Sequence, residues 1–182
     1  MTPPISEQDI QKLRAGDLVS ITGKIVTARD KAYARVISGE KPPMELQGGV
    51  VYHCGPLVKR TPKGWRVISA GPTTSARLDR IQVDFVRRTG VRALVGKGGM
   101  DEEVAAQLAR LGCVYLAFTG GAGVLAARAI EKIEMVFWED LGDAESLWVL
   151  GVRDFGPLVV AIDARGGNLY LRRRHRCFEK SK

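Results

Sequence analysis

Apolar and polar positions repeat with two different periods along this chain, and each period predicts a different kind of element. A period of two, or a short apolar run bounded by Gly and Pro, is typical of a β-strand. This pattern predicts strands within residues 18–29, 50–72, 90–100, 113–123 and 147–170. We expect two strand pieces in each of the first two stretches, and two or three strands in the last.

A period near 3.6 predicts helices, and it occurs between the expected strands. It covers residues 30–40, 75–88, 101–112 and 124–136, after a short amphipathic segment at 6–17. Strands therefore alternate with helices in the middle of the chain, and strand pairs flank them. This order favours an α/β layered domain with a mixed sheet.

The length of 182 residues suits one domain over residues 1–182. We expect its core at about 16–170 and a basic tail at 171–182. The sequence shows no internal repeat and no low-complexity segment.

Four times an expected strand runs into a turn and then a helix, within residues 26–32, 70–77, 95–103 and 118–126. In an α/β sheet such turns gather at the carboxyl ends of the strands, where ligands bind. Three of them carry or adjoin a cation, namely Arg29, Arg77 and Lys97. This grouping predicts a ligand with more than one negative group. Two alternatives remain open: Lys97 could be solvated, and Arg29 could pair with Asp30 or another surface acid.

The stretch GPTTSARLDR, residues 71–80, adds a local anomaly. Thr73, Thr74 and Ser75 are hydroxyl residues of the kind that begin helices. Arg77 would then lie in the first helical turn, where the backbone is already positive and a cation costs roughly 0.3–1 kcal/mol. A residue that breaks a local rule tends to mark a functional site, so we expect an anion there.

The formal net charge is +8, which suits an acidic partner or a solvated basic surface. Basic and aromatic residues are not interleaved on one element, so nucleic-acid binding is not expected. No apolar stretch approaches the roughly 20 residues of a membrane span. The first ten residues lack the basic-then-apolar pattern of a signal peptide, and we expect a cytoplasmic protein.

The three cysteines, Cys54, Cys113 and Cys177, are far apart and form no CxxC pair. They predict neither a disulfide framework nor a zinc site, and they suggest a reducing compartment. The two histidines, His53 and His175, share no ligand spacing. We therefore expect no metal site built by this chain alone.

The segment GAGVLA, residues 121–126, fits a GxGxxA pattern between a strand and a helix. Asp140 and Asp143 fall near the acidic position of a dinucleotide fingerprint. These acids lie in an expected loop instead of ending a strand, which weakens the match. A nucleotide- or phosphate-binding module remains the alternative from a different functional class.

Five segments in order resemble a known enzyme family: residues 16–30, 71–79, 95–100, 118–130 and 154–170. Together they are similar to the beta subunit, or C-terminal domain, of class I fumarate hydratase and its relative L-tartrate dehydratase. The motifs GPTTSAR and GKGGM are the most specific. The resemblance implies a swivelling β/β/α layered fold.

The resemblance also implies an activity and partners. These enzymes add or remove water across a dicarboxylic acid with a [4Fe-4S] cluster, whose cysteine ligands belong to the alpha subunit. The expected assembly is a heterotetramer of two alpha and two beta subunits. Fumarate hydratase is the favoured reading, and L-tartrate dehydratase or another 2-hydroxy diacid hydratase is the alternative. An interaction domain without a catalytic partner is a third possibility.

Site residues follow from the motifs one by one. Arg29, Arg77 and Lys97 match the family's substrate-binding cations, Thr74 lies beside them in the same motif, and Thr73 is the candidate for proton transfer. The alternative role of Thr73 is a helix cap. Two positions depart from the family pattern: Ala28 replaces a glycine, and Tyr33 replaces a histidine. The Tyr33 hydroxyl could support Arg29 or shift the substrate preference.

Overall fold

The computed structural model describes residues 1–62 and 64–171. The remaining residues include almost all of the expected basic tail, whose prediction therefore lies outside the described part. The elements, in chain order, are α1 (Glu7–Lys12), β1 (Leu18–Thr27), α2 (Asp30–Ile37), β2 (Val50–Tyr52), β3 (Leu57–Thr61), β4 (Gly64–Ser69), the 3₁₀ helix η1 (Ser75–Leu78), α3 (Gln82–Thr89), β5 (Ala93–Gly96), α4 (Glu102–Arg110), β6 (Val114–Ala117), α5 (Gly123–Arg128), β7 (Ile130–Phe137), the 3₁₀ helix η2 (Glu139–Leu141) and β8 (Leu147–Ile162).

Six strands form one mixed sheet in the order β1-β2-β5-β6-β8-β7. Neighbours among β1, β2, β5 and β6 are parallel, whereas β8 runs antiparallel to β1, β6 and β7. Because β8 pairs with both β6 and β1, the strands β1, β2, β5, β6 and β8 close into a barrel. The expected α/β fold with a mixed sheet is confirmed.

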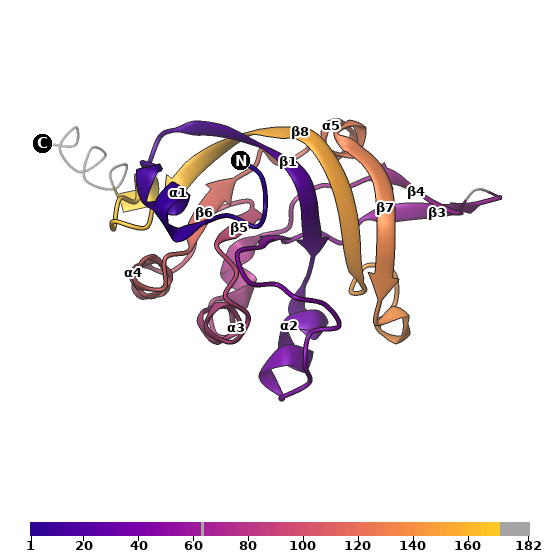
Figure 1. Cartoon of the computed structure of the whole chain (residues 1–182), viewed down its shortest axis with the longest axis horizontal. Helices are drawn as coiled ribbons and strands as arrows, with labels where there is room; N and C mark the ends of the chain where they lie inside the picture. The colour runs from indigo at the N-terminus through magenta and orange to yellow at the C-terminus, as the bar shows by residue number, and fades with distance from the viewer. Residues whose placement is uncertain (63, 172–182) are drawn as a thin grey trace, which may run out of the picture.

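The short parallel strands are apolar on both faces, which explains their unbroken apolar runs. On β5, Leu94 packs toward the helices, while Ala93 and Val95 face the other way. Helices α2, α3 and α4 lie together against one face of the sheet (Figure 1). The opposite face is enclosed by the barrel and packs around large side chains such as Trp148 and Phe155.

The antiparallel half of the chain differs most from the sequence predictions. Residues 124–136 are not one helix, because α5 ends at Arg128 and β7 begins at Ile130. The register of β7 against β8 shifts twice, between Ile130 and Lys132 and between Ile133 and Met135. Each shift adds a residue, so apolar side chains three apart all reach the core, as they would in a helix.

Three further differences concern strands and the third expected helix. Residues 18–29 hold one strand, β1, which continues through Gly23 with register shifts, and residues 147–170 hold the single 16-residue strand β8. Residues 50–72 hold three strands, because β2 ends before the β3–β4 hairpin. The expected helix at 75–88 is divided into η1 and α3.

Within the part of the chain that the structure describes, no helix combines the length and the apolar character needed to cross a membrane.

Candidate functional site

Three of the four predicted turns follow parallel strands of the six-stranded sheet, whereas the turn at 70–77 follows β4 of the separate β3–β4 hairpin. Arg29 lies two residues after the end of β1, His53 directly follows β2, Lys97 directly follows β5, and Phe118 directly follows β6. All four strands run in the same direction, so these residues lie at neighbouring carboxyl ends. This is the expected position for a ligand site in an α/β sheet.

The GPTT segment inserts between the ends of β2 and β5. The Thr73 N–H donates to the His53 carbonyl at 2.7 Å, and the Lys97 N–H donates to the Thr73 carbonyl at 3.1 Å. The Ser75 N–H in turn donates to the Lys97 carbonyl at 3.1 Å. These bonds fix the backbone of Thr73 and Lys97 relative to each other, although the residues are far apart in sequence.

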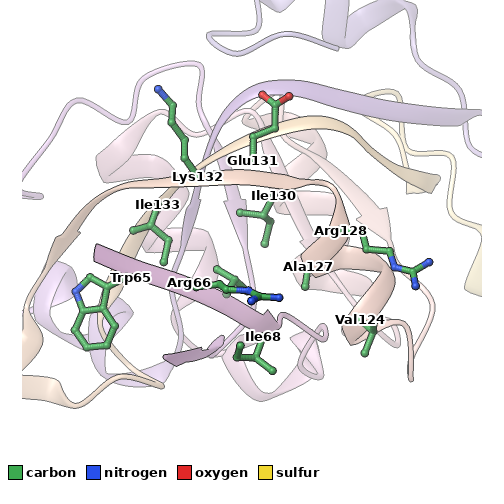
Figure 2. Close-up of a pocket in the computed structure, with 11 residues that line it drawn as sticks. Trp65, Arg66, Ile68, Val124, Ala127, Arg128, Ile130, Glu131, Lys132 and Ile133 are labelled. Carbon is green, nitrogen blue, oxygen red and sulfur yellow. The ribbon is translucent and has the colours of Figure 1, made fainter. Parts of the chain in front are cut away.

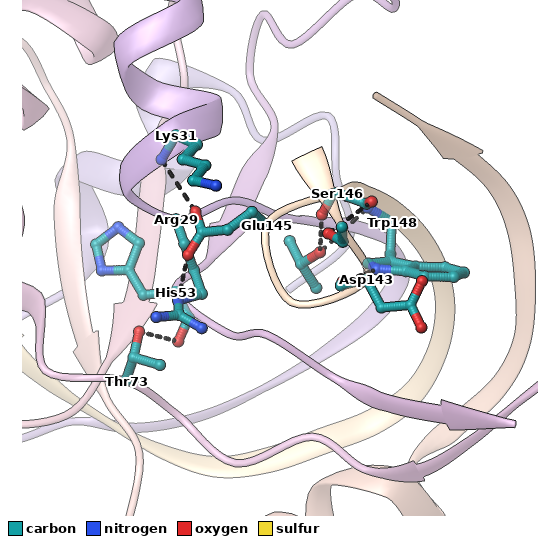
Figure 3. A network of polar contacts seen from close by, with 10 residues as sticks. Arg29, Lys31, His53, Thr73, Asp143, Glu145, Ser146 and Trp148 are labelled. Atoms are coloured by element: carbon teal, nitrogen blue, oxygen red, sulfur yellow. Dashed lines mark hydrogen bonds and ion pairs between the residues drawn. The ribbon is translucent and has the colours of Figure 1, made fainter. Parts of the chain in front are cut away.

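The side chain of Thr73 does not cap a helix. Its hydroxyl donates to the His53 carbonyl at 2.9 Å, and the residue before η1 is Thr74, whose side chain makes no capping bond (Figure 3). The predicted alternative role of Thr73 as a helix cap is therefore wrong. The half-buried hydroxyl is held at the site by a backbone acceptor.

Arg77 lies in a different environment from the one expected. It is exposed in the last turn of η1, and the regular helix α3 begins five residues later, at Gln82. Arg77 is therefore not in the first turn of an α-helix, the position that the sequence predicted. The argument that its position there indicates a bound anion is wrong. Its proximity to Thr73 and Thr74 in the same segment remains.

Arg29 is held by an acid that the sequence did not single out. It occupies the N-cap position of α2, and its Nε lies 3.4 Å from Oε1 of Glu145 (Figure 3). Its Nη1 lies beside Gly55, just after β2, where an added Cβ would stand 2.8 Å from that nitrogen. Arg29 therefore pairs with an acid, as the alternative expected, but the acid is the mostly buried Glu145 and not Asp30. Arg29 and Thr73 converge on the same short segment, residues 53–55.

Lys97 and Arg77 differ from Arg29 in having no acidic partner. Among residues 1–62 and 64–171, neither forms an ion pair. The aliphatic stem of Lys97 passes close to the fourth turn, since a Cβ on Gly120 would lie 3.7 Å from its Cδ. Two cations are therefore available to an anionic ligand.

A buried series of hydrogen bonds among hydroxyl groups and one imidazole connects these turns. His53 is fully buried between Tyr33, whose Oη is 2.8 Å from Nε2, and Ser75, whose Oγ is 2.8 Å from Nδ1. Ser75 donates to Tyr115 at 3.0 Å, and Tyr115 donates to the Gly98 carbonyl at 3.2 Å. With the Ser75 proton used in this way, its oxygen accepts from Nδ1–H, and Nε2 accepts from Tyr33.

Burial lowers the pKa of His53 to about 3, so the imidazole is neutral at physiological pH. The hydrogen-bonded series from Tyr33 through His53, Ser75 and Tyr115 to Gly98 joins the end of β2 to the turns that carry Thr73 and Lys97. Tyr33 also stacks on Phe85, with ring centroids 3.9 Å apart. The suggestion that the Tyr33 hydroxyl supports Arg29 directly is wrong, because that hydroxyl faces His53. Nothing in the pattern around His53 signalled this role.

The TGGAG turn packs on the GPTT turn and does not form a dinucleotide site. A Cβ on Gly123 would lie 3.2 Å from the Gly71 nitrogen, so glycine permits this close approach. The helix that follows, α5, has six residues and leads into β7, which is antiparallel to β8. A parallel βαβ unit, which the fingerprint requires, is therefore not formed here. Asp140 instead pairs with Arg35 at 2.5 Å.

The described residues do not fit an iron–sulfur cluster or another metal. Within those residues, no group of three His, Cys, Asp or Glu side chains could hold a metal ion. Cys54 and Cys113 are buried free thiols, and burial raises the pKa of each to about 12. Thiolates are the ligands of such clusters, so these two side chains are poor candidates.

A separate groove of about 440 Å³ lies between β4, α5 and β7 (Figure 2). It is lined by Trp65, Arg66, Val67, Ile68, Val124, Ala127, Arg128, Ile130, Glu131, Lys132 and Ile133. None of the predicted site residues is among them. The candidate site is the group of residues at the strand ends, comprising Arg29, Thr73, Thr74 and Lys97, with Arg77 exposed on the adjoining helix η1.

Comparison with known proteins agrees with the motifs at these strand ends. The family described as Fumarase C-terminus matches residues 1–173. The chain belongs to this family. It is 42% identical over 170 residues to the L(+)-tartrate dehydratase subunit beta of Escherichia coli strain K12, which covers 93% of this chain and 85% of that protein.

Two other relatives carry a similar sequence in chains of different length. A putative L(+)-tartrate dehydratase subunit beta from Methanocaldococcus jannaschii is 39% identical over 181 residues, or 97% of this chain and 93% of that protein. A putative class I fumarate hydratase from Geobacillus stearothermophilus is 40% identical over 168 residues, which is 92% of this chain and 32% of that protein. The domain thus occurs as a subunit and as part of a longer chain.

Proposed function

We propose that this chain is the beta subunit of a hydro-lyase that acts on a four-carbon 2-hydroxy diacid. The observation that supports this most directly is that Arg29 and Lys97 lie at the carboxyl ends of β1 and β5, while Thr73 is bonded between the ends of β2 and β5, in the chain order of the family motifs. A diacid carries two negative groups, and the proposed site has Arg29, which is paired with Glu145, and two cations without an acidic partner among the described residues, Arg77 and Lys97. The names of the relatives support the same class of reaction.

In this proposal the cations bind and orient the diacid. A guanidinium grips a carboxylate with two parallel N–H bonds, so Arg29 and Arg77 would hold the carboxylates. Lys97 would supply a compact positive charge between them, because its backbone is tied to Thr73. Removal of a proton beside a carboxylate increases the negative charge on that group. The same cations then stabilise the transition state more than the bound substrate.

Thr73 is the proposed group for proton transfer at the carbon beside that carboxylate. A free threonine hydroxyl is a weak base, and nearby positive charge makes its deprotonated form more accessible. The bond from its hydroxyl to the His53 carbonyl, at 2.9 Å, holds the oxygen in one orientation. Thr74 follows it in the same segment and contributes a second hydroxyl to the proposed site.

A partner is part of the proposal because the described residues supply no ligands for the [4Fe-4S] cluster implied by the resemblance. We assign the cluster to an alpha subunit, in an assembly of two alpha and two beta subunits in the cytoplasm. The free thiols Cys54 and Cys113 are compatible with a reducing compartment. No step attributed to this chain passes through the cluster.

Fumarate hydration to L-malate and L-tartrate dehydration are the two candidate reactions. Relatives with either name are about equally similar to this chain, at 42% and 40% identity. The deciding experiment is anaerobic co-expression with an alpha subunit, followed by kcat/KM for L-malate, fumarate and L-tartrate. No activity on any diacid with the cluster intact would overturn the proposal.

The proton-transfer role of Thr73 is tested in the same heteromer. Thr73→Ala should lower kcat by about 10²–10⁴-fold, the usual contribution of a positioned acid or base. Thr73→Ser should keep part of the rate because it keeps a hydroxyl. Thr61→Ala, at the end of β3, is the control and should leave kcat unchanged. Near-normal kcat in Thr73→Ala with full cluster content would remove Thr73 from the mechanism.

A further inference from the structure

Glu145 lies in the loop between β7 and β8, and its carboxylate contacts both the Arg29 side chain and the backbone at the start of α2. Its Oε1 lies 3.4 Å from Arg29 Nε, and its Oε2 accepts from the Lys31 backbone N–H at 2.9 Å (Figure 3). The two charged side chains are mostly buried, with 23% of Arg29 and 15% of Glu145 exposed. Solvent therefore screens this pair less than it screens an ordinary surface ion pair.

The loop that presents Glu145 is itself held in place. The N–H groups of Glu145 and Ser146 both donate to the Gly142 carbonyl, at 2.9 and 2.8 Å. The Trp148 indole donates to the Asp143 carbonyl at 2.8 Å, and the Trp148 backbone N–H donates to the Thr27 hydroxyl at 3.1 Å. Thr27 is two residues before Arg29, so the loop is anchored beside the residue that its carboxylate contacts.

The Arg29 guanidinium has little room to turn away from this carboxylate. A Cβ on Gly55 would stand 2.8 Å from Arg29 Nη1 and 2.6 Å from the Ala144 carbonyl, so the head group lies in a narrow slot. Arg29 Nε is buried and has no hydrogen-bond partner within residues 1–62 and 64–171. Glu145 is the acid that faces this buried edge, at ion-pair distance.

We propose that Glu145 is a positioning residue for Arg29. Its carboxylate holds the Nε edge of the guanidinium, while its bond to Lys31 ties that orientation to the start of α2. The terminal nitrogens of Arg29 are then presented to the substrate in one orientation. This lowers the entropic cost of forming two hydrogen bonds to a substrate carboxylate. This inference rests on the proposed role of Arg29 in diacid binding.

A merely structural role would have a different signature. A carboxylate near the first turn of α2 stabilises that helix whether or not Arg29 is present. Its loss would lower the melting temperature equally in either background, without a specific effect on substrate binding. A positioning role instead predicts that the kinetic effect of Glu145 disappears when Arg29 is removed.

The test is a double-mutant cycle in the alpha–beta heteromer, with Glu145→Gln, Arg29→Ala and the double variant. Glu145→Gln keeps an acceptor for Lys31 but loses the charge, and we expect kcat/KM to fall about tenfold, within the range for coupled neighbours. The Kd of an unreactive four-carbon diacid should rise by a similar factor. In the Arg29→Ala background, the same change should alter both quantities by less than about twofold.

Two further variants complete the design. Glu145→Asp keeps the charge and should recover part of the loss, whereas Asp143→Asn removes an exposed charge from the same loop and should behave as wild type. If kcat/KM falls in Arg29→Ala but stays normal in Glu145→Gln, the role of Glu145 is overturned while the proposed role of Arg29 stands. A Glu145 effect of full size in the Arg29→Ala background would overturn the role of Glu145 as well. Normal kinetics for Arg29→Ala itself would overturn the proposed role of Arg29, and the inference with it.

Discussion

The neutral state of His53 makes a quantitative prediction about stability and pH. In the folded chain, burial lowers the pKa of this imidazole to about 3, and both ring nitrogens have partners in Tyr33 and Ser75. In the unfolded chain the same group titrates near its ordinary value of about 6.5. Below that value the unfolded state binds one more proton than the native state. Stability is therefore complete above about pH 6.5 and is lost as the pH falls toward the folded pKa.

The size of the effect follows from linkage. Each pH unit between the two pKa values costs about 1.4 kcal/mol for one group. Between about pH 7 and about pH 5.5, which straddle the unfolded value, the loss from His53 is about 1.2 kcal/mol. Carboxylates remain ionised over most of this interval, so they contribute little to the difference.

The assay is urea unfolding of the purified chain at these two pH values, with the free energy of unfolding obtained by linear extrapolation. His175→Asn removes the other histidine and isolates the contribution of His53. His53→Asn in that background should abolish the pH-dependent difference. Because that variant could be too unstable to measure, the ring C–H signals of His53 should also be followed by NMR. A folded-state titration of His53 near pH 6.5 would refute the reasoning.

Three glycine substitutions test the packing that brings the turns together. Gly96→Ala would place a methyl group against the Ser75 hydroxyl and 3.1 Å from His53 Nδ1, so we expect a loss of about 1–3 kcal/mol in urea unfolding; Gly120→Ala, whose nearest neighbour is 3.7 Å away, should change stability by less than about 0.5 kcal/mol. Gly55→Ala would crowd the Ala144 carbonyl and Arg29, so kcat/KM of the heteromer should fall along with the melting temperature; a stable variant with unchanged kcat/KM would show that the slot around Arg29 is not tight.

The parallel half of the fold was predictable because its sequence signals are local. The strands containing Val51, Leu94 and Tyr115 are buried on both faces, and the apolar runs of the last two end in glycine-rich turns. The gathering of the turns after β1, β5 and β6 follows from the parallel direction, whereas the turn that carries Thr73 follows β4 of the separate hairpin and joins them through backbone hydrogen bonds to His53 and Lys97. Arg29 and Lys97 lie at the carboxyl ends of the parallel strands β1 and β5, as the pattern predicted, although β2 lies between these two strands.

The antiparallel half was not predictable from periodicity because its register shifts alter the period. Ile130, Ile133 and Val136 are three residues apart and all pack on the core, although they belong to a strand. Arg77 was misplaced for a related reason, since the hydroxyl residues before it precede a single 3₁₀ turn instead of the regular helix. Both errors come from tertiary pairing that overrides a local pattern.

Glu145 was missed because its importance depends on contacts between residues far apart in the chain. It lies in a loop with three other acids, at residues 139, 140 and 143, and only the folded chain distinguishes it from them. Lys31, whose N–H it accepts, is 114 residues away. A spacing rule along the chain has no access to a pair of this kind, and it gave no signal for the buried role of His53 between Tyr33 and Ser75.

The closure of the barrel explains why an antiparallel strand matters to a site at the parallel strand ends. The register of β1 against β8 pairs Val26 with Val149, so the residues just before β8 lie beside the residues just after β1. That pairing brings the loop with Glu145 to Arg29, and the bond from the Trp148 N–H to the Thr27 hydroxyl locks the two segments together. A sheet without this closing strand would still join Thr73 to Lys97, because the backbone bond between them does not involve β8. It would leave Arg29 without a partner for its buried edge, so the orientation of that guanidinium is a property of the closed barrel.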